Sequence, residues 1–466
     1  MSLITRVRDW ERRTRPTDPA IAAAMDRRWE GLPEHVKTPA QLLGRRTTGC
    51  EGTHGVFPAC DFACKPCYHS ADANKVRVDG EHTKTEVAKQ MDFLHEQRGP
   101  QSHVQLIGGE VSLLEAEDHA ATIDLMRARG RVPMSFSHGD VSDQYLRDVA
   151  LDSDGKKRWA DWSWAVHFDR TMFGREGAKK PQSERELQPF RKKFMDMVEK
   201  LREETGLRHY VAHNMTVTPD NVAEVAEVVR DSKDLGFRMM SFQPAAYVGN
   251  EQRWTSDFRE VTDDSVWAEI EDGVGTRLPY KALQFGDFRC NRVSWGAWVD
   301  DSYVPVLDED DADDLHARDE FFRVFKGNYI SQDRSVIRWR VARLVLRNPG
   351  ILPVAFGWFR RFAKRAGGLR ALRSGPVHPM TYVMHNFMDA RVVAPAWELN
   401  KVGEVSDDVE IRAAQERLAA CAYTMGHPES NELIPACVQH SILDPNENRE
   451  LVSLLPMPTR RKPQPV

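Results

Sequence analysis

Three cysteines lie within eight residues of one another, in the segment Cys60-Asp-Phe-Ala-Cys64-Lys-Pro-Cys67-Tyr68. Soft thiolate ligands favour iron-sulfur clusters, zinc or copper(I). Three thiolates from one loop can hold three irons of a cubane cluster and leave the fourth iron without a protein ligand, so that this iron becomes a place for chemistry. A structural zinc ion with His69 as its fourth ligand is the alternative for the same loop.

A second short motif, Gly108-Gly109-Glu110, ends a run of apolar residues of strand length. Paired glycines at a strand end let the backbone approach a ligand closely. A carboxylate at the same place can accept hydrogen bonds from an ammonium group. The motif alone is a common turn, but its position after the cysteines predicts that both belong to one ligand site.

The order and spacing of the two motifs resemble those of the radical S-adenosylmethionine (SAM) superfamily, over residues 50–245. The resemblance implies a [4Fe-4S] cluster ligated by Cys60, Cys64 and Cys67, with SAM on the open iron and Gly108, Gly109 and Glu110 positioning it. It also implies reductive cleavage of SAM to methionine and a 5′-deoxyadenosyl radical that removes hydrogen from a substrate. The electron donor would be a reductase, a ferredoxin or a flavodoxin.

Two positions depart from the pattern of that family. Pro66 stands where an aromatic residue normally precedes the third cysteine, and Val111 stands where a proline often follows the glutamate. Neither change removes a ligand, so the departures bear only on how the adenine is packed. We expect Tyr68 to compensate by lying against the adenine.

Polar residues at the ends of predicted strands are further candidates for binding SAM. Ser137 begins a short polar turn that resembles one often found in the family. The other candidates are Asp169, Asn214 and Gln243, each able to bond the ribose or the carboxylate of SAM. A polar residue at such a place can equally satisfy the backbone groups of its own loop, so the prediction concerns the set.

Four more cysteines, Cys50, Cys290, Cys421 and Cys437, are widely separated in the sequence. Four soft ligands suffice for an auxiliary iron-sulfur cluster. Cys421 and Cys437 flank a stretch with the glycine and prolines of a ligand-bearing loop. Isolated buried cysteines are also common core residues, and both interpretations stay open.

The segment His385-Asn-Phe-Met-Asp-Ala390, followed by Cys421 and Cys437, resembles the C-terminal part of the radical SAM branch that includes tetraether lipid synthases. This resemblance points to a long acyl or isoprenoid chain as substrate. The C–H bonds of such a chain offer no acidic proton, so that radical abstraction can act on them and ordinary acid-base groups cannot.

The elements that carry these residues alternate in type, with short apolar runs between longer amphipathic stretches, as in repeated βα units of a parallel sheet. In such folds the strand ends and the loops after them carry the chemistry. Strands are expected at 104–107, 133–137, 162–168, 210–217 and 237–242, with a sixth near 55–57. Helices are expected at 86–96, 115–129, 184–204 and 221–235. With the resemblance, this implies an α/β fold: a partial six-stranded (β/α) barrel with an N-terminal helical leader and a mainly helical C-terminal extension.

Length and composition describe a folded protein of 466 residues, 41% hydrophobic and 29% charged, with room for a core domain and one or two additions. The net charge of -5 argues against a nucleic-acid partner. The first thirty residues lack the apolar core of a secretory signal, and the longest apolar run, at 351–359, is interrupted by Pro353 and Gly357. The odd count of seven cysteines argues against a paired disulfide framework. We therefore expect a cytoplasmic protein.

Charge is strongly segregated beyond residue 300. Residues 300–320 hold ten acidic residues and one Arg, and we expect a solvated loop and helix face there. Residues 334–373 hold ten Arg and one Lys without Asp or Glu. Within 352–365 the apolar side chains Leu352, Phe356, Phe359 and Phe362 share one helical face, and most of the cations (Arg360, Arg361, Lys364, Arg365) the other. This pattern predicts an interfacial helix on an anionic membrane surface, with a core helix or an RNA-binding patch as alternatives.

The expected organisation is a helical leader (1–45), a radical SAM core (46–250), a core completion with the acidic region (251–333), a basic membrane-contacting segment (334–375) and a C-terminal region (376–466). The expected function is that of a radical SAM enzyme, peripheral on the inner face of the cell membrane, which modifies a lipid chain by C–C coupling or another reaction. One alternative is a radical SAM enzyme that acts on a peptide or RNA. The other is a zinc-stabilised, membrane-associated binding protein.

Overall fold

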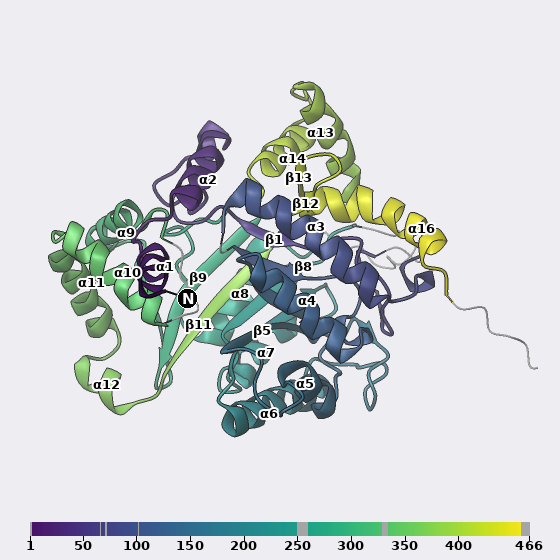
Figure 1. The fold of residues 1–466 in the computed structure, drawn as a ribbon, viewed down its shortest axis with the longest axis horizontal. Helices are drawn as coiled ribbons and strands as arrows, with labels where there is room; N and C mark the ends of the chain where they lie inside the picture. The colour runs from purple at the N-terminus through teal and green to yellow at the C-terminus, as the bar shows by residue number, and fades with distance from the viewer. Residues whose placement is uncertain are drawn as a thin grey trace, which may run out of the picture.

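The computed structural model describes residues 2–65, 67–69, 72–100, 102–248, 260–328 and 334–457. Its centre is an 11-stranded sheet, and eight adjacent strands of this sheet run parallel and curl into a partial barrel (Figure 1). In sheet order the parallel strands are β12 (Tyr423–His427), β1 (Cys50–Gly52), β3 (His103–Leu106), β4 (Val132–Ser137), β5 (Asp161–His167), β7 (Arg208–Val217), β8 (Met239–Pro244) and β11 (Val377–His385). The predicted α/β partial barrel is confirmed.

Three antiparallel strands complete the two edges of the sheet: β13 (Glu432–Pro435) beside β12, and β9 (Asn291–Val299) with β10 (Ser302–Pro305) beyond β11. A separate antiparallel pair joins β2 (Ala63–Cys64) to β6 (Met172–Phe173). Strands β11 and β12 were not expected from the sequence. They add one parallel strand to each end of the six-stranded core, because segments more than 300 residues apart pair across β1 and β12.

The strand expected near 55–57 is wrong, since the sheet uses β1 five residues earlier. Gly55 has a φ of +61°, which takes the chain out of the extended conformation. Phe57 is fully buried, so its apolar character reflects packing under the sheet end and not strand pairing. The other five expected strands are confirmed within a few residues.

Helices cover the outer face of the sheet and build both extensions (Figure 1). The four expected helices are α3 (Gly80–Arg98), α4 (Ala116–Ala128), α6 (Gln188–Thr205) and α7 (Val225–Ser232), and α5 (Asp143–Ala150) and α8 (Asp263–Val274) accompany them. The N-terminal segment forms α1 (Leu3–Arg13) and α2 (Pro19–Glu30). The later helices are α9 (Ala312–Phe325), α10 (Arg334–Arg347), α11 (Ile351–Arg365), α12 (Leu369–Ser374), α13 (Ala390–Val402), α14 (Val409–Ala419), α15 (Ala436–Val438) and α16 (Asp444–Leu454). The expected boundaries near residues 250 and 333 lie outside the described residues.

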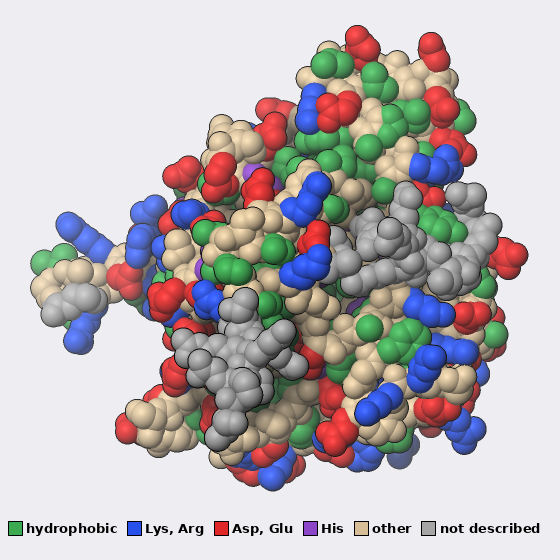
Figure 2. Space-filling view, turned by 90° about the vertical axis from the view of Figure 1, so that its right-hand side faces the viewer, with side chains coloured by type: hydrophobic (Ala, Val, Ile, Leu, Met, Phe, Trp, Pro, Cys, Tyr) green, Lys and Arg blue, Asp and Glu red, His purple; other side chains and the backbone are tan. Residues whose placement is uncertain are grey.

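The acidic segment 300–320 is solvated as expected at most of its acidic residues, but Asp314 is buried and pairs with the basic segment. Asp314 of α9 is fully buried, and its carboxylate pairs with Arg361 at 2.7 Å and Arg365 at 2.8 Å. These two cations of α11 therefore face α9, in ion pairs between the two segments that the sequence did not predict. On the α16 side of the molecule, Figure 2 shows cationic and anionic side chains mixed over the surface. Among the described residues, no helix is both long and apolar enough to cross a membrane.

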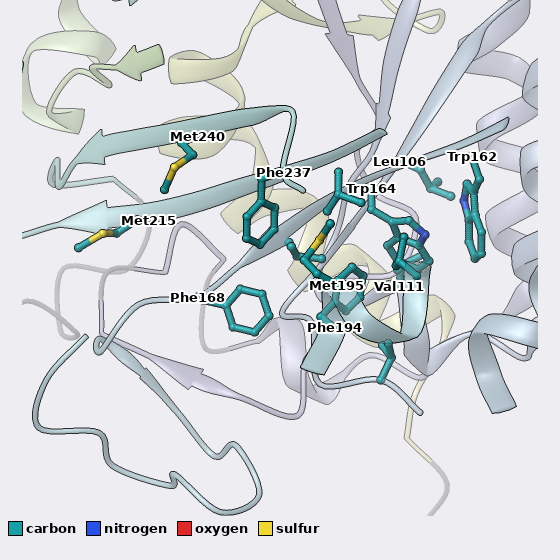
Figure 3. Packing of buried hydrophobic residues seen from close by; sticks show 14 of the residues in the cluster. Leu106, Val111, Trp162, Trp164, Phe168, Phe194, Met195, Met215, Phe237 and Met240 are labelled. Atoms are coloured by element: carbon teal, nitrogen blue, oxygen red, sulfur yellow. The ribbon is translucent and has the colours of Figure 1, made fainter. Parts of the chain in front are cut away.

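The main core lies between the sheet and the outer helices. Trp162 and Trp164 of β5 are fully buried and their rings lie 4.5 Å apart. Phe194 and Met195 of α6 pack toward the same strand, with the Phe194 ring 5.9 Å from that of Trp164 (Figure 3). Burial of these large apolar surfaces holds the strands in place, so the loops at the strand ends are set on a rigid support.

Candidate functional site

The two glycines of the Gly-Gly-Glu motif pack against the backbone that leads into the cysteine loop, residues 60–68. Gly109 N donates to Phe57 O at 2.6 Å, and Glu110 N donates to Ala59 O at 2.9 Å. A Cβ on Gly109 would lie 2.0 Å from Ala59 O, and one on Gly108 would lie 2.7 Å from the Phe57 ring. The sequence predicted a close approach to a ligand. In the structure the close approach is to residues 57–59, and it fixes the start of the cysteine loop against the end of β3.

Glu110 is buried directly beside this junction. Its carboxylate accepts hydrogen bonds from Ser112 N at 2.9 Å, from Ser137 Oγ at 2.9 Å and from His138 N at 2.8 Å. Ser137, predicted as a SAM contact, therefore touches Glu110. An ionised carboxylate has about four lone-pair sites, so these three donors leave Glu110 able to accept one more hydrogen bond.

His138 links the end of β4 to the cysteine loop. Its Nε2 lies 2.9 Å from Asp61 Oδ1, and its ring stacks on Phe62 with centroids 3.9 Å apart. Burial opposes a positive charge on His138, but the neighbouring Glu110 and Asp61 outweigh burial and raise the pKa of the imidazole. The sequence analysis predicted Ser137 of this turn as a site residue. In the structure His138, the next residue of the same turn, also belongs to the site.

The three predicted cluster ligands come from one loop that has very little regular structure. Cys60 N donates to Asn74 Oδ1 at 2.9 Å, and Phe62 N donates to the Cys60 Sγ at 3.4 Å. Cys64 is anchored by the β2–β6 pair, opposite Met172. Burial, with smaller contributions from the nearby Glu110 and Cys67, raises the pKa of Cys60 to about 12. Thiolates in such a setting are stabilised by a bound metal cation, so the donor set fits an iron-sulfur cluster. Pro66 lies outside the described residues.

Tyr68 and His69 close the loop onto the same strand end. Tyr68 Oη donates to Gly108 O at 3.2 Å, and His69 Nε2 donates to the same oxygen at 2.6 Å. The Tyr68 ring lies 4.1 Å from the ring of His440, which comes from the C-terminal region. The side chain of Tyr68 is therefore already fixed beside Gly108, and its contact with adenine remains a prediction.

The remaining strand-end candidates form two separate groups. Asp169 accepts from Thr216 N at 3.0 Å and pairs with His167 Nε2 at 2.7 Å. Burial opposes the charge on Asp169, but His167 and the hydrogen bonds lower the pKa of this carboxyl to about 2. Gln243 Nε2 donates to Asn214 Oδ1 at 3.4 Å. Asp169 also accepts from Thr171 N at 2.8 Å, so it ties its own loop to β7, whereas Asn214 and Gln243 lie side by side on β7 and β8.

Arg175 belongs to the site although no sequence motif marks it. Its side chain is fully buried, Nη2 donates to His138 O at 2.6 Å, and the guanidinium lies 4.7 Å from the centre of the Phe168 ring. Nη1 is buried and has no hydrogen-bond partner among the described residues. Burial lowers the pKa of Arg175, and the nearby Cys64 is one of the groups that oppose this shift. A buried guanidinium with an unused donor suits a carboxylate ligand. Because Arg175 follows the two-residue strand β6, no periodic pattern pointed to it.

Three of the four remaining cysteines converge around Arg417. Arg417 Nε donates to the Cys290 Sγ at 3.2 Å. Burial, together with the nearby Cys421, raises the pKa of Cys290 to about 11 and that of Cys437 to about 12. Cys50 lies instead on β1, where its Sγ accepts from Gln105 Nε2 at 3.6 Å. Of the four cysteines predicted for an auxiliary cluster, three therefore lie near one another, and Cys50 lies elsewhere.

A cavity of about 340 Å³ opens beside these cysteines, at the ends of β8 and β11. The segment 386–389, singled out in the sequence, forms one wall of the cavity, and Arg417 forms another part. Phe387 in this wall lies 6.0 Å from the His440 ring. Since His440 also contacts Tyr68, a short row of rings joins the cavity wall to the cysteine loop.

No protein-family model matches the chain, and no curated protein matches it. Among solved structures, Streptococcus suis SuiB bound to S-adenosylmethionine is similar with a TM-score of 0.31 and 9% identity, covering 45% of this chain and 43% of SuiB. SuiB bound to its precursor peptide SuiA has a TM-score of 0.30, 10% identity and coverage of 48% and 43%. Native anSMEcpe with bound AdoMet has a TM-score of 0.29, 12% identity and coverage of 41% and 50%. The matched part is at most half the length of these proteins.

Proposed function

We propose that the protein is a radical SAM enzyme whose cluster is held by Cys60, Cys64 and Cys67. The observation that carries the proposal is the direct backbone junction between the Gly-Gly-Glu motif and the cysteine loop, which keeps Glu110 beside the thiols. When bound, a [4Fe-4S] cluster and SAM would supply reductive cleavage to a 5′-deoxyadenosyl radical, which abstracts hydrogen from the substrate.

The residues of the chain have separate tasks in this proposal. Glu110 offers its remaining lone pair to the ammonium group of SAM, and Ser137 holds the carboxylate of Glu110 in position. Arg175 offers its unused Nη1 donor to the carboxylate of SAM. Tyr68, fixed by Gly108 O, presents a ring for the adenine. Asn214 and Gln243 on neighbouring strands are placed for the ribose, and Asp169 supports its loop.

The test is anaerobic reconstitution with iron and sulfide, followed by reduction with SAM and measurement of 5′-deoxyadenosine. Wild-type protein is expected to bind iron and acid-labile sulfide and to release 5′-deoxyadenosine. Serine at Cys60, Cys64 or Cys67 should abolish the product, whereas Cys50→Ser serves as the matched control because Cys50 lies on β1. Protein that holds zinc and no sulfide, or a Cys64→Ser variant with full turnover, would contradict the proposal.

For the substrate we propose a membrane lipid chain, because an apolar and cationic surface lies on the N-terminal and basic helices. On α11 the side chains of Leu352, Phe356 and Phe359 are 55%, 63% and 41% exposed, beside exposed Arg360 and Lys364. On α1 the apolar residues Leu3, Ile4 and Val7 are exposed as well, and Trp10 of α1 contacts Trp339 of α10 at 5.6 Å. Apolar side chains next to cations are suited to an anionic membrane surface.

Vesicle sedimentation tests this surface. Wild-type protein is expected to bind vesicles that contain anionic lipid more strongly than neutral ones, and Phe356→Asp should weaken binding at least tenfold. Phe288→Asp is the matched control, because Phe288 is 58% exposed at a different place. If Phe356→Asp binds anionic vesicles as strongly as Phe288→Asp does, the proposed membrane-binding surface is wrong. The substrate class is identified by a separate measurement, the transfer of deuterium from a labelled acyl chain to 5′-deoxyadenosine.

A peptide substrate is the second candidate, favoured by the charges around the cavity. Arg289, Asp389 and Arg417 line it, and Arg391 and Glu410 at its rim form an ion pair of 2.9 Å. Charges of both signs suit the backbone and termini of a peptide better than an acyl chain. If SAM cleavage is stimulated by a peptide library and not by lipid extracts, the peptide proposal replaces the lipid one. The net charge of -5 disfavours RNA.

We also propose that Cys290, Cys421 and Cys437 hold a second iron-sulfur cluster beside the cavity. Their thiols are close enough to influence one another, and Cys437 is buried whereas Cys290 and Cys421 are half-buried. In a variant with serine at Cys60, Cys64 and Cys67, reconstitution should then still incorporate about four iron atoms per chain. Absence of iron from that variant would show that the three thiols are core residues.

A further inference from the structure

Two histidines and a glutamate meet at a place that the proposed reaction does not use. His54 follows β1, His427 is the last residue of β12, and Glu447 lies in the first turns of α16. One ligand atom from each of the three side chains lies within 4.8 Å of the others. All three side chains are partly buried, with His54 10% and Glu447 23% exposed.

The sheet itself brings the two histidines together. Strands β1 and β12 are parallel, with Gly52 opposite Met425, so two residues further along His54 lies beside His427. The two rings stack at 3.7 Å between centroids, with an angle of 13°. The backbone of His54 is held on both sides by the Gln90 side chain, with hydrogen bonds of 3.2 Å and 2.9 Å. This position is therefore set by the fold and not by the rotamers of a loop.

Hydrogen bonds assign the proton of the His54 ring. Nε2 lies 3.0 Å from Gly426 O, and a carbonyl oxygen can only accept, so Nε2 is the donor. Nδ1 then faces both oxygens of Glu447, at 3.1 Å and 3.2 Å. If the His54 ring were neutral, the lone pair of Nδ1 would face the negatively charged carboxylate of Glu447. A proton or a metal cation is therefore required between Nδ1 and this carboxylate.

The network around His427 assigns the second ring. Gln439 Nε2 donates to Asp444 Oδ1 at 2.8 Å and to Glu447 Oε2 at 3.1 Å, so the amide nitrogen must point toward these carboxylates. The amide oxygen of Gln439 therefore accepts from His427 Nε2 at 2.6 Å. The neutral form of His427 keeps its lone pair on Nδ1.

We propose that His54, His427 and Glu447 form a binding site for a divalent transition-metal ion, best matched by zinc. Two imidazoles and one carboxylate are a common donor set for Zn²⁺. A hydrogen bond from the second ring nitrogen to a carbonyl or amide oxygen is the usual support of a metal-binding histidine, and both rings have one. Donor atoms around tetrahedral zinc lie about 3.3 Å apart, so the donor atoms need to approach by about 1.5 Å at most, and the stacked rings need to turn so that both lone pairs point at one ion.

An ion here would tie the C-terminal helix α16 to the ends of β1 and β12. Gln439, which bonds both His427 and Glu447, begins the π-helical turn 439–443. The next residue, His440, contacts Tyr68 of the cysteine loop. The proposed site is thus separate from the cluster ligands and supports them through the C-terminal segment. It does not rest on the proposed radical chemistry.

The experiment uses the full-length protein after iron-sulfur reconstitution and passage over a chelating resin. Zinc is added, unbound metal is removed, and zinc and iron per chain are measured by mass spectrometry. One zinc per chain is expected in wild type. His427→Ala and Glu447→Gln should lower zinc affinity at least tenfold without loss of iron, and exposed His378→Ala should bind as wild type does.

Cobalt(II) provides a second measurement on wild-type protein, which is needed if a variant does not fold. A site of two imidazoles and one carboxylate gives visible d–d bands without the intense thiolate-to-cobalt charge-transfer band. The proposal is overturned if wild type and both variants hold equal zinc, or if all bound cobalt shows the thiolate band. A melting temperature that rises with zinc in wild type but not in Glu447→Gln would support it.

Discussion

Replacing Gly109 by alanine tests whether the end of β3 positions the cysteine loop. The added Cβ would lie 2.0 Å from Ala59 O and 2.4 Å from Pro58 O, whereas ordinary contacts begin at 3.4 Å. The obstructing atoms are backbone, so they cannot rotate away. Residues 58–59 must therefore move by about 1.4 Å, and Cys60 follows them directly in the chain.

The energetic cost follows from the contacts that such a shift breaks. The hydrogen bonds from Gly109 N and Glu110 N to residues 57 and 59 would be lost or stretched, at about 1 kcal/mol each. Overpacking adds about 1 to 3 kcal/mol. We expect Gly109→Ala to lower the free energy of unfolding by roughly 3 to 5 kcal/mol and to reduce iron incorporation strongly, because the thiols no longer hold their spacing.

Urea unfolding followed by circular dichroism, and iron and sulfide per chain after reconstitution, measure the two effects. Gly350→Ala is the matched control, since a Cβ there meets no atom within 4 Å and the residue has a φ of -62°. If Gly109→Ala unfolds within about 1 kcal/mol of wild type and takes up the same iron, the junction does not position the loop and the reasoning fails.

Three other predictions concern stability and ligand binding. Burial lowers the pKa of His119 from 6.5 to about 3, so the imidazole stays neutral in the folded protein. In the unfolded chain the same imidazole binds a proton below about pH 6.5. The free energy of unfolding should therefore fall by about 2 kcal/mol between pH 7 and pH 5. Urea unfolding at both pH values should show that His119→Asn lacks this part of the loss. Asp314→Asn leaves Arg361 and Arg365 without their buried carboxylate and should cost about 3 kcal/mol in the same assay, whereas Asp313→Asn, at a carboxylate 80% exposed, should cost under about 0.5 kcal/mol. Arg175→Lys keeps the charge but cannot reproduce the planar fork; equilibrium dialysis should show SAM binding at least tenfold weaker, with exposed Arg373→Lys unchanged.

Local patterns predicted the parts of the fold that depend on neighbouring residues. Apolar runs ending in polar turns identified β3, β4, β5, β7 and β8, because each of these strands is a continuous stretch of sequence with several buried residues. The same rule misplaced the first strand, since Phe57 is apolar for packing under Gly108 and not for pairing. Strands β11 and β12 were missed because their partners lie far away in the chain.

Side-chain direction was the second limit of sequence reasoning. Helical periodicity correctly predicted α11 and placed most of its cations on the face other than the apolar one, but it did not show that Arg361 and Arg365 pair with the buried Asp314 of α9. Asp314 precedes Arg361 by 47 residues in the sequence, and no local rule connects the two segments. Likewise, Arg175 lies in an irregular segment, so that only the folded chain shows its contact with His138.

The cysteine loop shows why the motif and the fold depend on each other. A loop with three thiols and two residues of strand has no internal structure that sets the spacing of its sulfurs. Its position comes from outside: the end of β3 binds residues 57–59, Gly108 O holds Tyr68 and His69, and His138 reaches Asp61 from β4. Each of these contacts starts from a strand end that the buried core keeps rigid. A change in the core packing around β4 should therefore alter the loop before it unfolds the sheet, because the loop is held in place by contacts from these strand ends.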